Sequence, residues 1–211
     1  MIRSLLLALL SILLLTACSS DPKSLFNEQV LNSHTPLAQT PQEAIQNAHV
    51  ESLPTNPGWR PPQWEITPQE PRIMLDGTPS NYRVFSIHLE QNEPFQINVD
   101  SWCVNACLGF SKYALTPYLM LLDNQGTVVA SGFGVVKGAV GSINQEIAGK
   151  VASSGLYYLI VAADNRNPGR TVVVDNVIII GAANRSITPL RIGMGSYPFG
   201  SISPYLSTAA E

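Results

Sequence analysis

The sequence has few of the residues that carry out chemistry at neutral pH. Only 13% of its 211 residues are charged, and it contains three histidines and three cysteines. His34, His49 and His88 are far apart along the chain and form no evident metal-binding pair. No phosphate-binding glycine loop, basic stripe with aromatics or carboxylate pair of assignable spacing is present. We therefore predict a protein that is not an enzyme and that has no metal site and no cofactor.

Basic residues are also scarce, which argues against nucleic acid as a partner. The chain has 12 Lys and Arg against 15 Asp and Glu. If residues 1–17 are removed, as argued next, only Arg3 is lost, which leaves 11 basic residues and a net charge near −4. This balance argues against a surface for nucleic acid or anionic lipid.

The N-terminus has the pattern of a secretory signal. Arg3 precedes an apolar run from Leu5 to Leu15, and small residues stand directly before Cys18. The run is too short and too lightly flanked for a stable membrane span. We predict a signal peptide over residues 1–17.

The segment Leu15-Thr16-Ala17-Cys18 resembles the lipobox of bacterial lipoproteins. That resemblance implies cleavage before Cys18 and acyl chains on Cys18, an anchor that does not exchange readily. Ser19 follows where an aspartate would retain an enterobacterial-type lipoprotein at the inner membrane, so the resemblance implies the periplasmic face of the outer membrane. The alternative is a soluble secreted protein in which Cys18 is an ordinary residue.

Two further cysteines stand in the stretch WCVNACLGF, at Cys103 and Cys107. In an oxidising compartment, a structural disulfide between them is the default. Zinc would need two further ligands nearby, and redox catalysis usually uses a C-x-x-C spacing. We predict a disulfide that shapes one loop.

Three short segments precede the main domain. Residues 18–40 lack a sustained period and predict a flexible lipidated tether, with short segments able to dock on a partner or on the domain. A short helix is predicted over residues 41–50, where Thr40 can cap, Pro41 suits the first position and Glu43 completes a capping box. A proline-rich connector follows over residues 51–64.

From there the apolar period becomes two, which predicts strands over a domain of residues 65–206. Residues 82–90 and 94–102, joined by Gln-Asn-Glu, predict a hairpin, and residues 118–130 predict another that turns at Gly126. Further strands are expected over 156–164, in 170–180 and near the C-terminus. The predicted fold is all-β, an antiparallel β-sandwich of jelly-roll or Greek-key type.

Polar and aromatic residues offer weak candidates for binding. Trp59, Trp64 and Trp102 would form a sugar-stacking platform if they were exposed together, although aromatics in such a chain more often fill a core. Ser86, His88 and Glu90 lie two apart on one strand, too far for a catalytic triad, and predict a polar sheet face. Residues 131–142, rich in glycine, predict a loop or an edge strand that pairs with another chain.

The order of several segments resembles the maltose operon periplasmic protein family, MalM-like. The resemblance covers about Leu53 to Leu206, through the segments SLP, TPQEPRIMLDGTPSNYRVFSIHL, LTPYLMLLDNQGTVV, YYLIVAADNRNPGRT and SYPFGSI. It implies a periplasmic, all-β, non-catalytic protein linked to maltodextrin uptake. The cysteine pair and the anchored N-terminus depart from that pattern. The segment PYLMLLDNQGTVV alone also resembles the hairpin of pre-peptidase C-terminal domains.

Two functions remain open from the sequence. The first is a structural or protein-interaction module: an outer-membrane lipoprotein that binds periplasmic or envelope partners, as an accessory subunit of an assembly such as a secretion system. The second is a MalM-like accessory protein in carbohydrate transport, with maltodextrin as a ligand.

Overall fold

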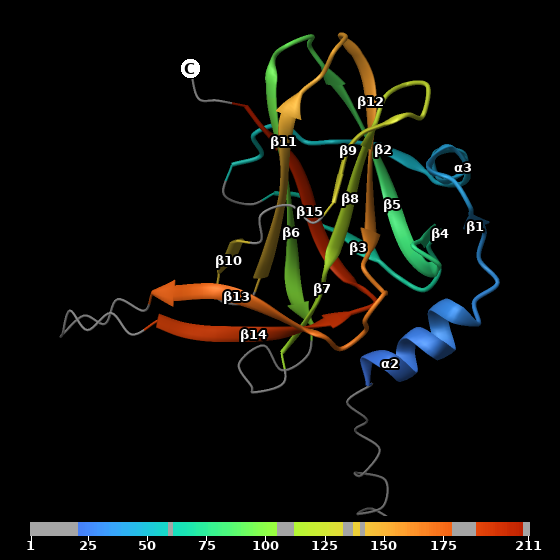
Figure 1. Ribbon diagram of the computed structural model, residues 1–211, viewed down its shortest axis with the longest axis vertical. Coiled ribbons are helices and arrows are strands. Elements are labelled where there is room, and N and C mark those ends of the chain that lie inside the picture. The colour runs from blue at the N-terminus through green and yellow to red at the C-terminus, as the bar shows by residue number, and fades with distance from the viewer. Residues whose placement is uncertain are drawn as a thin grey trace, which may run out of the picture.

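A computed structural model of the chain describes residues 21–58, 61–104, 112–132, 137–139, 142–178 and 189–208. Side chains of residues 137–139, 173–178 and 189–192 are outside this description. Within the described part, the strands form two mixed sheets, of seven and eight strands, that face each other as a sandwich (Figure 1). The predicted all-β sandwich is confirmed. Three of the neighbouring strand pairs are parallel, so the sheets are not purely antiparallel.

The seven-stranded sheet has β12 near its centre, as its continuous apolar sequence requires. Its order is β1 (Leu37–Ala38), β4 (Arg72–Leu75), β5 (Thr78–Leu89), β12 (Gly155–Ala163), β8 (Pro117–Leu122) and β9 (Val128–Gly132), with β2 (Val50–Ser52) parallel to β5. The β8–β9 hairpin is the one predicted from the sequence, and Gly126 closes it with a φ of 81°.

The eight-stranded sheet has β6 near its centre. Its order is β10 (Lys137–Ala139), β11 (Ser142–Lys150), β6 (Pro94–Val104), β7 (Tyr113–Leu115), β14 (Pro189–Tyr197) and β13 (Thr171–Ile178), and β15 (Gly200–Ser207) pairs with both β6 and β3 (Trp64–Ile66). The glycine-rich stretch 131–142 therefore contributes β10, which pairs with β11. The residues around β10, 133–136 and 140–141, lie outside the described part of the chain.

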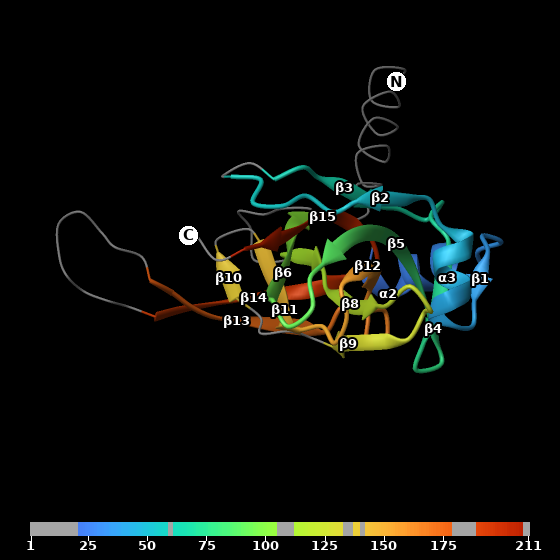
Figure 2. The same cartoon turned by 90° about the horizontal axis from the view of Figure 1, so that it is seen from above.

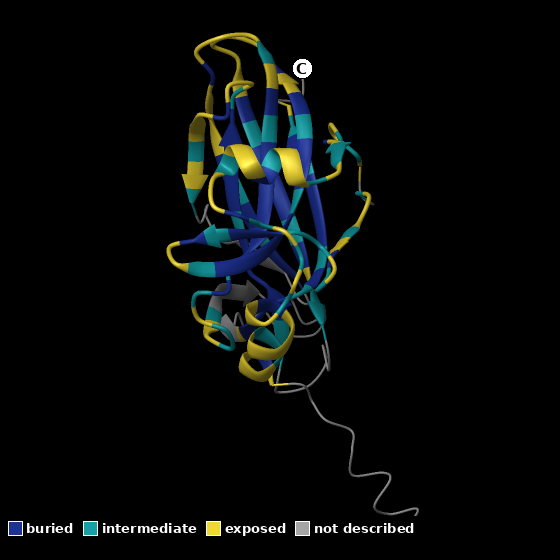
Figure 3. Cartoon of the chain, turned by 90° about the vertical axis from the view of Figure 1, so that its right-hand side faces the viewer, coloured by how far each residue is buried: buried dark blue, intermediate teal, exposed yellow. Residues whose placement is uncertain are grey.

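The main core lies between the two sheets. Phe85, Ile87 and Leu89 project from one sheet and Phe95, Ile97 and Val99 from the other, all buried in one apolar cluster. Figure 3 shows the buried residues running along the strands, while the helices carry exposed residues on their outer side. Alternation along each strand places one set of side chains in this core, as the period of two predicts.

The predicted hairpin of residues 82–90 and 94–102 is wrong. β5 belongs to the seven-stranded sheet and β6 to the eight-stranded sheet, so the chain crosses between sheets at residues 90–93. Asn92 takes a positive φ of 61° in this crossing. The alternation had identified the inward face of each strand correctly, but it contains no information on which strand is the neighbour.

The segment predicted as a flexible tether, residues 18–40, is docked on the domain over the part that the structure describes, from residue 21, which is the docking that the sequence analysis allowed for its short segments. Asp21 caps α2 (Pro22–Leu25), which continues into one wider turn, η2 (Phe26–Leu31), and β1 then pairs with β4. The Arg72 guanidinium, itself 6% exposed, donates to Val30 O at 2.8 Å and Thr35 O at 2.7 Å. These bonds, with the full burial of Val30, hold the segment on the domain.

The short helix predicted over residues 41–50 is present as α3 (Pro41–Asn47). Thr40 accepts a hydrogen bond from Glu43 N at 3.2 Å, as an N-cap should. Ala44 is buried in a second apolar cluster, where α3 covers the outer face of the seven-stranded sheet. Between α3 and β3, the proline-rich residues carry the chain from β2 in one sheet to β3 in the other.

Two strands extend well beyond the sandwich. β13 and β14 pair antiparallel, and both views show them projecting together from one end of the molecule as a two-stranded ribbon (Figures 1 and 2). We call this ribbon the arm. Its root is held by a small apolar cluster of Ala114, Ile143 and Met194, against which Cys103 and Val172 pack.

Candidate functional site

The predicted modification sites lie mostly outside the described residues. Cys18 precedes residue 21, and Cys107 falls in the undescribed range 105–111. Cys103 is the second-last residue of β6 and pairs with Ala114 of β7. The lipid anchor and the Cys103–Cys107 disulfide therefore stay predictions. Intact mass with and without reductant, after alkylation, tests the disulfide.

The three tryptophans do not make one stacking platform. Trp64 lies at the edge of the main core, with its ring edge-on to Phe85 at 5.1 Å between centroids, and its indole N–H bonds to the Glu51 carboxylate. Trp102 lies on the outer face of β6, 36% exposed. Trp59 is outside the described residues. Since Trp64 and Trp102 point to opposite faces of the sheet, the joint platform proposed from the sequence is wrong for these two residues.

The polar residues on β5 have ordinary structural contacts. Ser86 Oγ donates to Glu51 O at 3.3 Å, while His88 and Glu90 form an exposed pair at 3.4 Å. Nucleophile and base are thus not brought together. In the β8–β9 turn, Asp123 Oδ1 accepts from the backbone N–H groups of Gln125 and Thr127, which is the turn role expected for an Asx residue.

The outer face of the eight-stranded sheet gathers polar and aromatic groups. Asp100 accepts a 2.8 Å hydrogen bond from Asn144, and Trp102 Nε1 donates to Ser203 Oγ at 3.2 Å. Burial raises the pKa of Asp100 more than the Asn144 bond lowers it. Tyr205, on the same face, has a pKa raised first by burial and then by the charges of Asp100 and Glu146. Stacking and hydrogen bonding to a flat polar ligand are the chemistry available here.

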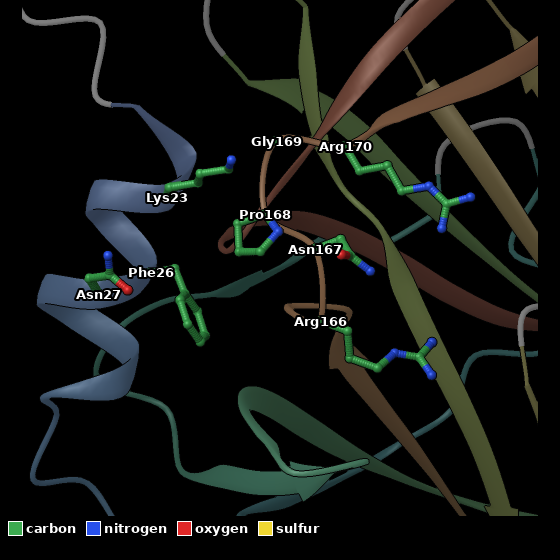
Figure 4. Close-up of a pocket in the computed structure, with 8 residues that line it drawn as sticks. All are labelled: Lys23, Phe26, Asn27, Arg166, Asn167, Pro168, Gly169 and Arg170. Atoms are coloured by element: carbon green, nitrogen blue, oxygen red, sulfur yellow. The ribbon is translucent and has the colours of Figure 1, made fainter.

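A cleft of about 480 Å³ separates the N-terminal helix from the loop between β12 and β13 (Figure 4). One wall carries Lys23, Phe26 and Asn27, and the other is the loop from Arg166 to Arg170. In Figure 4 the Lys23 side chain reaches toward Gly169, whereas the two arginine side chains point away from the helix. Lys23 is therefore the one basic side chain of these that points across the cleft. Otherwise the cleft is the gap between α2 and the β12–β13 loop.

The charge of Arg166 is balanced by two carboxylates, Asp164 and Asp76. Its guanidinium donates to Asp164 at 2.8 Å and to Asp76 at 2.6 Å, and it lies 5.4 Å from the centroid of the Tyr118 ring. The bond to Asp164 is the main reason that the pKa of Arg166 is raised. Arg166 thus links the β12–β13 loop to the β4–β5 turn, and we assign it a structural role.

Neither a metal site nor a spanning helix is found in the described ranges. No group of three or more His, Cys, Asp or Glu side chains is arranged there to hold a metal ion. The helices of that part of the chain are too short or too polar to cross a bilayer.

Two functional features escaped the sequence reasoning. The docked helix had a usable signal, because Asp21-Pro22 has the N-cap residue and first-turn proline of a helix start. The placement of Lys112 beside Gly195 of β14 had none, since that contact joins residues far apart in the chain.

Comparison with known proteins gives little. No family model matches the sequence. No curated protein matches it either. A solved structure, the pre-peptidase C-terminal domain of collagenase from Bacillus anthracis, aligns with a TM-score of 0.32 and 10% identity, over 75% of this chain and 95% of that chain. It is the class of domain that the β8–β9 hairpin resembles, and at this similarity it carries no argument about activity. The MalM-like resemblance has no support from these comparisons.

Proposed function

We propose that the chain is a non-catalytic outer-membrane lipoprotein, anchored through Cys18 on the periplasmic side, that acts as a protein-interaction module. In this role it is an accessory subunit of an envelope assembly, such as a secretion system. The observation that carries the proposal is the arm.

The arm is unlike the rest of the fold, because its two strands leave the sandwich together (Figure 2). A two-stranded ribbon is marginal in water without a further strand or a packed face. Its sequence is apolar at consecutive positions, Val172-Val173-Val174, a pattern typical of a strand that is covered on both faces. β13 is also the last hydrogen-bonded strand of its sheet within the described residues, with β10 close to it but not paired with it, which suits pairing with a strand of another protein.

In-cell photocrosslinking tests the proposal directly. A photoreactive amino acid at position 177 of the arm is expected to capture a defined envelope protein. The same residue at position 129 of β9, where Val129 is 46% exposed, serves as the matched control. The lipidated, tagged chain is then purified in mild detergent and its crosslinks are identified by mass spectrometry. A monomer with no crosslink at position 177 would remove the basis of the proposal.

A second candidate, the MalM-like role in maltodextrin uptake, is favoured by one observation. Trp102 and Tyr205 share the polar outer face with Asp100 and Asn144, which is chemistry suited to a sugar. Isothermal titration with a maltodextrin series tests it, with Trp102→Ala as the binding-deficient variant. The absence of a heat of binding at millimolar maltodextrin would contradict direct sugar binding.

A further inference from the structure

One end of the sandwich carries three basic side chains without partners. Lys23 on α2 and Arg170 in the β12–β13 loop are exposed, and Lys112 before β7 is half-buried. None of the three has a hydrogen-bond or ion-pair partner for its side chain among the described residues. We call these three residues the basic end.

Backbone contacts place the three residues at one end of the sandwich, where the Arg170 side chain points away from α2 (Figure 4). Gly195 N donates to Lys112 O at 2.7 Å, and the next residue, Ser196, donates to Arg170 O at 2.8 Å. Gly169 lies against the helix, since a Cβ added there would be 3.8 Å from Cβ of Pro22. Figures 1 and 3 agree in placing α2 at this lower end of the sandwich, which is also the end from which the arm leaves.

Nearby acidic groups do not cancel the basic end. Asp164 and Asp76 are bound to Arg166, a fourth basic residue. Asp21 is exposed but caps the helix through Ser24 N at 3.1 Å. Glu28 is exposed farther along the same helical segment. Three cations therefore lie near two carboxylates of the N-terminal helix, Asp21 and Glu28, so this end keeps an excess of positive charge although the chain as a whole is acidic.

The distance to the proposed anchor is short. The described helix starts at Pro22, four residues after Cys18, and an extended chain covers at most about 3.6 Å per residue, or roughly 14 Å. This upper limit is comparable to the Debye length of about 10 Å at 0.1 M salt. A lipid on Cys18 therefore keeps the basic end within electrostatic reach of the headgroups, while the acidic remainder of the domain is farther away and screened.

We infer that the basic end is a membrane-contact surface, which rests Lys23, Lys112 and Arg170 on anionic phospholipid headgroups and so fixes the orientation of the anchored domain. The inference rests on the proposed lipid anchor, and for this end of the domain it replaces the expectation, drawn above from the net charge of the whole chain, that no surface for anionic lipid is present. Because residues 21–38 are packed on the sandwich, the domain does not swing on a long tether, and the arm leaves from the end nearest the bilayer.

Lysine footprinting on vesicles tests the inference. The lipidated chain is reconstituted into phosphatidylcholine vesicles with or without phosphatidylglycerol, acetylated briefly, and analysed by mass spectrometry. Each cation near an anionic surface contributes about a fivefold preference, so Lys23 and Lys112 are expected to react about fivefold more slowly on the anionic vesicles. Lys150 is exposed at the C-terminal end of β11 and is the internal control. It is expected to react at the same rate on the two kinds of vesicle. High salt should remove the difference.

A double variant, Lys23→Gln with Arg170→Gln, is expected to abolish the protection of Lys112, whereas Lys150→Gln should leave it intact. Equal reactivity of Lys23, Lys112 and Lys150 on both vesicles would overturn the inference and leave the basic end available to an acidic protein. Intact mass, measured first, separates this outcome from failure of the anchor itself: a chain without acyl groups on Cys18 contradicts the proposed function.

Discussion

At the scale of single residues, Asp100 shows the cost of placing a carboxylate in the middle of a sheet face. Burial raises its pKa in the folded state, even though Asn144 donates to it. Between the ordinary pKa and the raised one, the folded chain binds more protons than the unfolded chain. Stability contributed by this group therefore falls as pH rises through that window and stays lower above it.

Asp100→Asn is expected to be slightly more stable than the parent near neutral pH, by about 0.5 kcal/mol. An asparagine oxygen still accepts from Asn144, and the penalty for the buried charge is gone. Urea unfolding at a series of pH values measures this. The advantage should vanish at pH values below the ordinary pKa of aspartate. An advantage that is independent of pH would show that charge is not its cause.

Arg72 has a different role, because its side chain links the N-terminal segment to the sheet. Removing its guanidinium takes the side-chain donor from Thr35 O and one of the donors from Val30 O, which also accepts from Ser33 N at 3.3 Å. Arg72→Ala is expected to lower the free energy of unfolding by about 2–4 kcal/mol. Arg170→Ala, which removes an exposed arginine with no partner for its side chain among the described residues, is the control and should change it by less than about 0.5 kcal/mol. Similar urea midpoints for the two variants would contradict this role.

At the scale of elements, α3 packs on the β8–β9 turn through a close contact between Gln42 and Gly126. Gln42 Nε2 donates to Gly126 O at 2.6 Å, and a Cβ at Gly126 would lie 2.3 Å from Gln42 Cγ. Gly77, in the β4–β5 turn, has the same φ of 81° with open space around it. The two glycines therefore separate backbone strain from steric contact.

Gly77→Ala is expected to cost about 1–2 kcal/mol, from its left-handed backbone alone. Gly126→Ala should cost about 1 kcal/mol more, because α3 must move or Gln42 must lose its bond. Thermal or urea unfolding of both variants measures the difference. Equal losses of unfolding free energy in the two variants would mean that α3 accommodates the added methyl group at no energetic cost.

The elements also show what the sequence predicts and what it does not. The period of two identified the inward residues of β5 and β6, and Thr40 and Pro41 marked the start of α3, because these signals are local. The assignment of β5 and β6 to different sheets depends on contacts with β12 and β11, which are far away in the chain. Local patterns cannot specify such pairings.

The candidate sites were predicted less well for the same reason. Trp64 and Trp102 were grouped by residue type, but the period that puts Ile66 in the core also puts Trp64 there and leaves Trp102 outside. The basic end was missed because Lys23, Lys112 and Arg170 meet only after β14 pairs with β7 and the N-terminal helix docks. Aromatic or basic residues become a site only when the topology places them together.

At the scale of the whole molecule, the N-terminal segment decides whether the protein is a domain on a tether or one folded unit that starts near the proposed anchor at Cys18. Val30 is fully buried, whereas the next residue, Leu31, is 52% exposed. Val30→Ala is expected to destabilise the whole sandwich by about 2 kcal/mol, through lost burial and a residual cavity. Leu31→Ala, the matched control, should change stability by less than about 0.5 kcal/mol.

Tryptophan fluorescence makes this prediction decisive, because none of the three tryptophans belongs to the N-terminal segment, and Trp64 and Trp102 are strand residues of the sandwich. If the segment unfolds together with the sheets, the fluorescence midpoint in urea falls for Val30→Ala and coincides with the midpoint from circular dichroism. An unchanged fluorescence midpoint would mean that the segment detaches on its own. The basic end would then lose Lys23, and a lipid on Cys18 would no longer fix the distance between the domain and the bilayer.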